Sequence, residues 1–447
     1  MMDPSHWPRE ILERTMQHGV DHAEVYLLLS TATTVEVKRQ KVDAFVSASS
    51  LGAGVRVYHE GRLGFSFTAL SDGSEIDAVV RNAVEGARFT EPDRGNVPAA
   101  TPTPSKEELE IFDPGLAEVT EEEKIARAMA LEKKALNTDS RIEVVRKASY
   151  SDTNYVVSIC NSEGLDASYR GTSCSSSIML RAGDGTNREM GWDSDGKRFY
   201  SELDVESIGV QAARNALEQL GARKLPTVKA PVLFTPLSAV NFLEVMISAF
   251  SADSVQKGKS LFQDKVGEKV ASSIVTLVDD GLMPRGLGSA PMDDEGVPMG
   301  RKSLIEAGVL QGFLHNSYTA AREGVASTGN GVRSGYTTTP HVGPTNLYVE
   351  RGDRSREQLL QDMGRGLEVR EIMGMHTANP ISGDFSVGVS GVWVENGKPS
   401  HPVRGGAIAG NFVDLLERIE GIGNDLRFYG AVGSPSLLIG NLSISGE

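Results

Sequence analysis

The sequence predicts an α+β protein with an N-terminal α/β part, made of two related strand-meander-plus-helix segments, and a C-terminal β-rich antiparallel domain. Three observations predict this fold class. Apolar and polar residues alternate in short runs, which is the period of half-buried strands. Two early regions each run through such strands into a helix, one containing RNAVE at 81–85 and the other RNALE at 214–218. Beyond residue 224, short apolar runs are separated by glycine-containing turns, a pattern typical of antiparallel sheet.

The first segment covers residues 1–90. A short helix is expected over Pro8–Gln17, closing near Gly19, and the alternation around Val35 and Val37 predicts a strand. HEGR at 59–62 predicts a hairpin turn that brings Val55 and Val57 to face Leu63, Phe65 and Phe67. The helix that ends the segment has apolar residues on one face, namely Ile76, Val79, Val80 and Ala83.

A linker and the second segment follow. Residues 91–105, EPDRGNVPAATPTPS, contain four prolines and few large apolar side chains, which predicts a linker. In residues 106–223, Thr120 and Glu123 form a capping box for a helix, and strand-like runs occur in RIEVVRKASY and NYVVSIC before the RNALE helix. The repeated order suggests an ancient duplication; the alternative is two unrelated amphipathic helices that share five residues by chance.

The third region, residues 224–447, is expected to be mostly antiparallel strands with only two or three helices. One helix is predicted over SREQLLQDMG at 355–364, with a serine start and a glycine stop. Another is predicted over SAVNFLEVMISAFSAD at 238–253, where apolar residues recur at helical spacing: Phe242, Val245, Met246, Ala249 and Phe250.

Composition narrows the class of function. Asp plus Glu number 60 against 45 Lys plus Arg, a formal charge of −15, so direct binding of nucleic acid is not expected. The opening MMDPSHWPRE has no basic stretch followed by an apolar core, and no segment is long and apolar enough for a membrane span. The two cysteines, Cys160 and Cys174, are too few for a disulfide framework or a cysteine-built zinc site. We expect a cytoplasmic protein with no membrane partner.

No complete catalytic constellation is visible, so no catalytic or metal-binding residue is predicted. The strongest candidates lie in two polar stretches of the third region. Residues 279–298 read as a loop without strand or helix period and carry five acidic residues: Asp279, Asp280, Asp293, Asp294 and Glu295. The alternatives for this loop are a functional site, with Asp293 and Asp294 contacting substrate, and a solvated acidic loop.

The second stretch is HTANPISGDFSVG at 376–388, which offers His376, Asn379 and Asp384 as substrate-binding candidates. His376 with Asp384 makes a poor catalytic dyad, since Ser382 and Ser386 lack any activating neighbour. The alternative is a buried turn that holds strands in register.

The C-terminal motifs resemble one known family. In order and spacing, DDEGVPMGRKSLIEAGVLQGFLHNSYTAARE, STGNGVRSGY, GMHTANPISGDFSVGVSGVWVENGKPSHPV, AGNFVDLLERIEGIGNDL and SPSLLIGNLSISGE are similar to the TldD/PmbA family, named for modulators of DNA gyrase and known as metalloprotease subunits. The likeness runs from about Ala23 to the end and is densest over 279–447. It implies an N-terminal α/β part of two related segments and a β-rich C-terminal part that holds the active site.

The resemblance also indicates a branch of that family. Its catalytic branch, TldD, carries an H-E-x-x-x-H helix early in the C-terminal domain and a cysteine near the chain end, which hold zinc with the glutamate as general base. Here the corresponding helix, 238–253, contains no histidine, and FYGAVGSPSLL at 428–438 contains no cysteine. The chain therefore resembles the PmbA branch, also called TldE, with no cofactor of its own and with zinc expected in a TldD-like partner.

The resemblance implies a non-catalytic subunit that helps a homologous TldD-like chain to degrade or process unfolded peptides. The alternative is a stand-alone peptide-binding or scaffold homodimer without peptidase activity. A third, weaker hypothesis is an autonomous hydrolase that uses a metal held by the carboxylates of residues 279–295.

Overall fold

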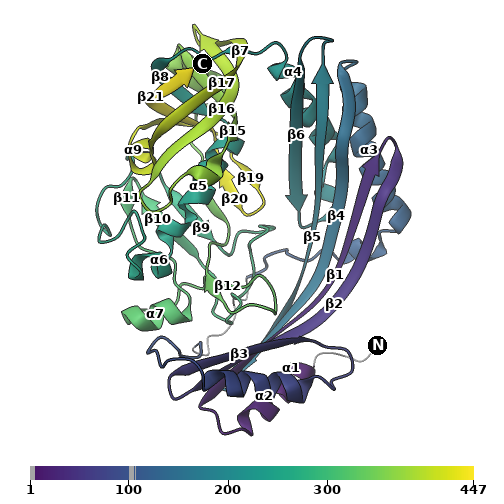
Figure 1. The fold of residues 1–447 in the computed structure, drawn as a ribbon, viewed down its shortest axis with the longest axis vertical. Helices are drawn as coiled ribbons and strands as arrows, with labels where there is room; N and C mark the ends of the chain where they lie inside the picture. Colours follow the sequence, from purple (N-terminus) through teal and green to yellow (C-terminus); the bar gives the residue numbers. More distant parts are fainter. Residues whose placement is uncertain (1–5, 100–104, 106, 447) are drawn as a thin grey trace.

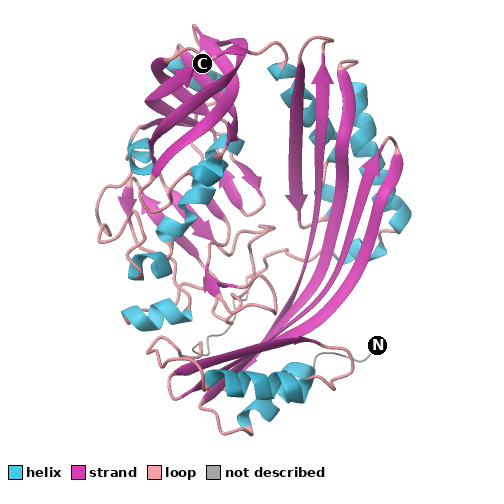
Figure 2. Ribbon diagram, viewed as in Figure 1, coloured by secondary structure: helices cyan, strands magenta, loops and turns pink. Residues whose placement is uncertain are grey.

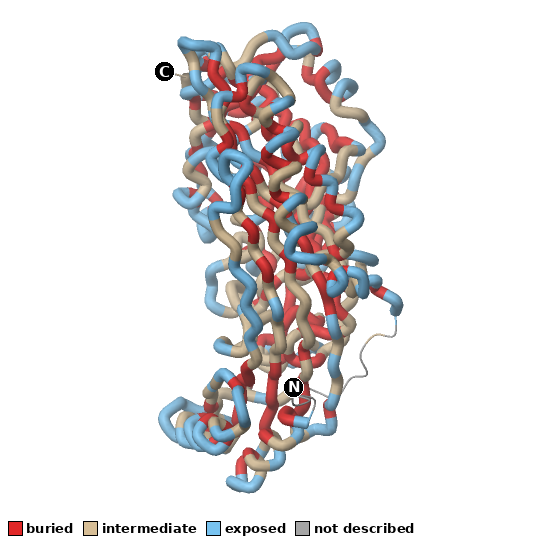
Figure 3. The backbone as a smooth tube through the Cα atoms, turned by 90° about the vertical axis from the view of Figure 1, so that its right-hand side faces the viewer, coloured by how far each residue is buried: buried red, intermediate tan, exposed pale blue. Residues whose placement is uncertain are grey.

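The computed structural model describes residues 6–99, 105 and 107–446, so residues 100–104 of the predicted linker lie outside the described residues. The structure divides into an N-terminal half, up to residue 222, and a C-terminal half, 223–446 (Figure 1). Within the described residues, no helix is long and apolar enough to cross a membrane. Figure 2 shows the curved sheet of the N-terminal half beside the C-terminal half. Seen from the side, the molecule is tall and narrow, and buried residues follow its long axis (Figure 3).

The N-terminal half is built on one antiparallel sheet of long, twisted strands, with the order β3-β2-β1-β4-β5-β6 among the described residues. These strands are β1 (His22–Lys38), β2 (Lys41–His59), β3 (Arg62–Ala69), β4 (Ile142–Asn161), β5 (Asp166–Gly183) and β6 (Arg188–Lys197). Helices α1 (Trp7–Met16) and α2 (Ile76–Ala87) pack on one end, and α3 (Glu121–Thr138) and α4 (Val205–Gln219) pack on the other end.

The element order α-β-β-β-α occurs twice in this half, which supports the predicted duplication. In each copy a glycine of the third strand lets the closing helix approach: a Cβ on Gly64 would lie 2.0 Å from the carbonyl oxygen of Ala83, and one on Gly191 would lie 2.3 Å from that of Ala212. Ala83 belongs to RNAVE, but Ala212 precedes RNALE by two residues. The two pentapeptides are therefore not at equivalent positions, and the repeated order is the better evidence.

The predicted hairpin forms, but its facing residues were assigned one position out of register. His59 pairs with Arg62 across a two-residue turn in which Glu60 and Gly61 both have positive φ, 52° and 73°. Phe65 consequently lies opposite Arg56, so Val55 and Val57 point to the other face. RIEVVRKASY and NYVVSIC, read as two strand-like runs, belong to the single strand β4.

The C-terminal half holds two larger sheets. In one sheet, neighbouring strands pair in the order β21-β8-β15-β16-β17, and β17 also pairs with β21, which closes a ring. Strand β18 pairs with β21 and β7 pairs with β17 outside this ring. The bounds are β7 (Arg223–Lys224), β8 (Val228–Phe234), β15 (Gly366–Met373), β16 (Asp384–Glu395), β17 (Lys398–Asn411), β18 (Ile419–Ile422) and β21 (Leu437–Gly446).

The other sheet has the order β11-β10-β9-β14-β20-β19, and a two-stranded sheet joins β12 to β13. The bounds are β9 (Leu277–Asp280), β10 (Arg301–Glu306), β11 (Val309–Leu310), β12 (Gly331–Val332), β13 (His341–Val342), β14 (Leu347–Val349), β19 (Arg427–Tyr429) and β20 (Val432–Ser434). The half is β-rich and mostly antiparallel as predicted, although β8–β15, β14–β20 and β7–β17 pair in parallel.

The expectation of only two or three helices here was wrong. The half contains α5 (Pro236–Met246), α6 (Ala252–Gln256), α7 (Ser317–Glu323), α8 (Arg356–Met363) and α9 (Phe412–Glu417). Helices of five to seven residues are too short to give a periodic signal; in two of them a local cap marks the start, Asn316 for α7 and Asn411 for α9. Helix α8 has the predicted serine start, with Ser355 and Gln358 in a capping box, and stops at Gly364.

Candidate functional site

The two segments that carry zinc ligands in the catalytic branch lie against each other in this chain. Helix α5, from the predicted 238–253 stretch, contacts β19 and β20, which come from 428–438 and its edge. The stretch is not one helix: α5 ends at Met246 and continues as a 3₁₀ turn, Ile247–Phe250, before α6. The two segments that the resemblance singled out therefore meet in this structure.

The side chains of α5 do not fit zinc. Phe242 of α5 packs against Phe234, Phe385 and Phe412, with ring centroids 4.8, 5.1 and 5.8 Å away. Met246 is buried in the same core. Zinc prefers histidine nitrogen and cysteine sulfur, and the helix offers neither. In the described ranges, no group of three or more His, Cys, Asp or Glu side chains is arranged to hold a metal ion.

A cavity of about 240 Å³ opens beside the start of α5, between the two halves. The N-terminal half contributes residues of β6 and α4. The C-terminal half contributes the start of α5 together with residues of or next to α8, β15, β16, β19 and β21. The lining residues are Met190, Gly191, Trp192, Asp193, Gln211, Asn215, Glu218, Gln219, Thr235, Pro236, Leu237, Arg356, Arg370, Glu371, Ser390, Arg427, Tyr429 and Ser436.

Carboxylates hold the three arginines of this cavity in place. Arg427 donates from one nitrogen to both oxygens of Asp193, at 2.8 and 3.0 Å, and joins β19 to the edge of β6. Arg356 donates to both oxygens of the fully buried Glu368, and Arg370 lies 3.1 Å from the same carboxylate. Burial raises the pKa of Asp193, against the opposing effect of Arg427. The cavity is thus rigidly lined but carries no excess of positive charge.

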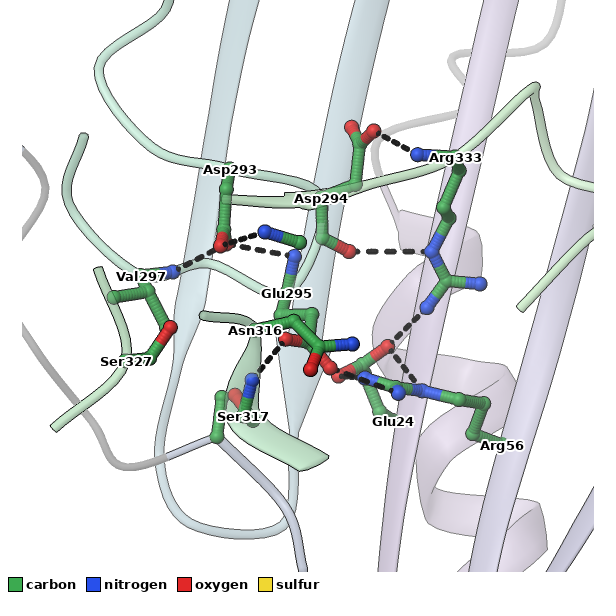
Figure 4. A network of polar contacts seen from close by, with 12 residues as sticks. Glu24, Arg56, Asp293, Asp294, Glu295, Val297, Asn316, Ser317, Ser327 and Arg333 are labelled. Carbon is green, nitrogen blue, oxygen red and sulfur yellow. Dashed lines mark hydrogen bonds and ion pairs between the residues drawn. The ribbon is translucent and has the colours of Figure 1, made fainter. Parts of the chain in front are cut away.

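A buried charge network locks the two halves together farther along the sheet (Figure 4). Arg56 of β2 donates to both oxygens of Glu24 on β1, at 3.0 and 2.5 Å, and to Glu295 of the C-terminal half at 2.9 Å. Arg333 reaches Glu24 at 2.5 Å, and Glu295 also accepts from the backbone N–H of Ser317 at 2.7 Å. Glu24, Glu295 and the Arg333 side chain are fully buried.

Asp293 and Asp294, predicted to contact substrate, belong to this network. Asp293 is fully buried and accepts from the backbone N–H groups of Glu295, Val297 and Gly331, at 2.9, 2.9 and 2.8 Å. Burial, followed by repulsion from Glu295, raises its pKa. Such a carboxylate anchors the loop to β12. Asp294 accepts from the backbone N–H of Arg333 at 2.7 Å, and burial raises its pKa to about 6.

Beyond Asp280 the stretch 279–298 is a loop without helix or strand, as predicted, but it is largely buried rather than solvated. Asp279 and Asp280 lie in β9, and Asp279 is fully buried, accepting from Asn330 at 2.9 Å and from the backbone of Thr345 at 2.6 Å. Lys302 completes its contacts at 3.1 Å. Asp279 therefore has structural contacts of its own, apart from the network that holds Asp293, Asp294 and Glu295.

His376, Asn379 and Asp384 come together in one exposed turn between β15 and β16. Asn379 accepts from the backbone N–H groups of Ile381 and Ser382 at 2.9 and 3.2 Å. Asp384 accepts from Asn411 and Ser382, whose hydrogen bonds lower its pKa. Among the described residues, no hydrogen bond or ion pair joins this turn to Asp293 or Asp294. The turn is exposed rather than buried, and a role in binding substrate remains a prediction.

Glu24, Arg56 and Arg333 were not predicted from the sequence, although the sequence around Glu24 and Arg56 contains an indication of their role. Glu24 interrupts the apolar run AEVYLLL, and Arg56 interrupts GVRVY. Charged residues in the middle of apolar strands are seldom buried unless they are paired. Both strands therefore indicated a buried ion pair, but not its partners in the C-terminal half.

Family models define the class of protein that carries this fold. The PmbA/TldA metallopeptidase domain 1 matches residues 23–87, the central domain matches 114–220, and the C-terminal domain matches 227–446. The chain belongs to the PmbA/TldD metallopeptidase family.

Particular relatives agree with this assignment. The chain is similar to Metalloprotease PmbA of Escherichia coli O157:H7, with 31% identity over 98% of this chain and 97% of the relative. It is also similar to a Metalloprotease TldD homolog of Haemophilus influenzae, at 27% identity over 96% and 94% of the two chains. A proposed modulator of DNA gyrase from Thermotoga maritima has a crystal structure with TM-score 0.90 and 30% identity, over 98% of this chain and 100% of that one. TldE from Thermococcus kodakarensis gives TM-score 0.89 and 25% identity, over 98% and 99%.

Proposed function

We propose that this chain is a PmbA/TldE-like, non-catalytic subunit that supports a homologous TldD-like chain in a zinc-dependent peptidase acting on unfolded peptides. One observation supports the proposal: α5, which packs against β19 and β20, contains no histidine, and its Phe242 and Met246 are buried in an apolar core. The TldD-like partner would supply the metal and its activated water.

The partner surface is expected on the C-terminal half. A homologous pair commonly associates through a two-fold or pseudo-two-fold interface, and an obligate contact of this kind would bury more than about 2,000 Å². Alone, the chain would form a homodimer through the same surface and exchange into a heterodimer when the partner is present. We expect this assembly to work in the cytoplasm.

The test is co-expression with the cognate TldD-like chain, followed by light scattering and a peptidase assay on an unstructured peptide. Activity should appear in the heterodimer, be lost when the partner's zinc-binding histidines are replaced, and be absent from the isolated chain. Zinc-dependent cleavage by the isolated chain would contradict the non-catalytic role.

A different result would favour the stand-alone homodimer. If no heterodimer forms and mixing produces no cleavage, the partnership is wrong. A dimer that binds peptides without cleaving them would then be the better description, and the cavity beside α5 gives that alternative a place for a ligand.

A further inference from the structure

We infer that the cavity beside α5 binds the main chain of a short, extended peptide segment through Gln219 and Arg370, with one apolar side chain against Trp192, Met190 and Leu237. The choice of a peptide as the ligand rests on the proposed function. It goes further in giving this chain a binding site of its own, separate from the partner's metal centre.

The apolar wall is the first observation. Trp192 and Met190, two residues apart on β6, are 37% and 44% exposed, although both are large apolar side chains. Leu237, at the start of α5, and Tyr429 of β19 lie across the same cavity. Apolar surface gathered in a concavity between two halves is typical of a ligand site.

Two polar atoms without partners are the second observation. Gln219 is 8% exposed; its amide nitrogen donates to the Gly391 carbonyl at 3.4 Å, but its carbonyl oxygen has no hydrogen-bond partner among the described residues. Arg370 uses one terminal nitrogen toward Glu368 and Glu218, at 3.1 and 3.4 Å, while its buried Nε is also without a partner in that part of the chain. Buried polar groups normally have partners.

A peptide group supplies both missing partners. Its N–H can donate to the Gln219 carbonyl oxygen and its C=O can accept from Arg370 Nε, once the two side chains turn these buried atoms toward the cavity. A free anion would meet only the second need. Asp193, Glu218 and Glu371 also line the cavity and offset its three arginines, so no excess of positive charge favours phosphate or a free carboxylate.

The segment bound must be short. The outward carbonyls of Trp192 and Ser194 on β6 already accept hydrogen bonds from Asn215 and Arg427, at 2.9 and 3.1 Å, so a long strand cannot add to this edge. The volume of about 240 Å³ is also below the roughly 300–1,000 Å³ of pockets for drug-sized ligands. One or two residues of a chain fit this space.

Calorimetric titration of the isolated full-length chain tests the inference. The probe is an acetylated and amidated tripeptide with a central leucine; the comparison probes are the same peptide with a central glutamate, and inorganic phosphate. The capped leucine peptide should bind saturably, the glutamate peptide more weakly, and phosphate should not compete.

Substitutions inside and outside the cavity test whether the peptide binds there. Gln219→Met and Arg370→Met should each raise Kd about fivefold or more, because each removes one hydrogen bond to the peptide group. Trp192→Ala should weaken binding through the lost apolar wall. Arg214→Met, on the exposed face of α4 and outside the cavity, should leave Kd unchanged.

Three results would overturn the inference: no saturable binding of the capped peptide, competition by phosphate, or an unchanged Kd in Trp192→Ala together with Arg370→Met. The surface position of Trp192 keeps the test valid if Gln219→Met fails to fold. Failure of the proposed function is a separate outcome, since it is measured as peptidase activity of the mixture and does not depend on peptide binding by the isolated chain.

Discussion

Replacing Arg56 by methionine should weaken the contact between the two halves more than any surface change. Arg56 is 5% exposed and makes three hydrogen bonds, two to Glu24 and one to Glu295, both of which are fully buried. Methionine approximates the length of the side chain but leaves Glu295 without a cation. Glu24 still accepts a hydrogen bond from Arg333 at 2.5 Å, so the charge of its carboxylate is still partly balanced by a cation.

The expected loss follows from that arrangement. Removing one member of a buried ion pair destabilises a protein by about 3–5 kcal/mol, because the remaining charge is desolvated and unpaired. Cooperative unfolding of 447 residues, at about 2.1 cal/mol/K per residue, has an entropy of about 0.9 kcal/mol/K. The melting temperature should therefore fall by about 3–5 °C, and by more if the two halves unfold separately.

Scanning calorimetry of the purified chain gives the measurement, with Arg81→Met on the exposed face of α2 as the matched control. The loss should shrink when Glu295→Gln is added, since a neutral amide replaces the unpaired carboxylate. A fall no larger than that of Arg81→Met, or a double variant no more stable than Arg56→Met, would refute the reasoning.

Three further changes test other parts of the structure. Burial raises the pKa of Asp294 to about 6, so its contribution to stability is largest below about pH 4 and is lost as pH rises through 6. Asp294→Asn should remove up to about 3 kcal/mol of this pH dependence of stability. If the melting temperatures of the variant and the unaltered chain change in parallel from pH 4 to 7, the assignment is wrong. Met246→Asp should lower stability by a few kcal/mol, because it puts an unsatisfied carboxyl group into the core around α5. The control Met246→Leu should lower it by less than about 1.5 kcal/mol. An unchanged melting temperature for the aspartate variant would mean that residue 246 does not face a core. The isolated chain should hold less than one zinc per molecule by elemental analysis, and tight one-to-one zinc would show that the chain has a zinc site of its own.

The features predicted well from sequence are those that a few neighbouring residues determine. Thr120 accepts from the backbone of Glu123 and the Glu123 side chain accepts from that of Thr120, as their spacing indicated. Ser355 and Gly364 bound α8 for the same local reason. The hairpin at 59–62 forms, but its register depends on two positive φ angles in the turn, which the alternation of apolar residues does not reveal.

The site was harder to predict because distant segments build it. Asp293 was noticed for its charge, yet its role depends on Gly331, 38 residues away, and on burial that only the packed halves create. The cavity joins Trp192, Gln219 and Arg370, which are far apart in the chain and have no shared motif. Periodicity cannot report such contacts. The family resemblance singled out the segments that form α5 and β19–β20, which the structure brings together, but it gave no information on what lies beside them.

The closure of the β21-β8-β15-β16-β17 ring has a consequence for how the protein is made. Strand β8 pairs with β15 on one edge and with β21 on the other. The first residue of β21 follows the end of β8 by roughly 200 residues, so this second edge stays unpaired until β21 has been synthesised. At about 5–20 residues per second, a ribosome needs about 10–40 s to deliver that strand. Throughout this interval the nascent chain presents an unpaired apolar edge, VLF at 232–234, of the kind that aggregates when left exposed. Growth conditions that slow translation or deplete chaperones should therefore reduce the yield of folded protein well before they affect the stability of the finished molecule.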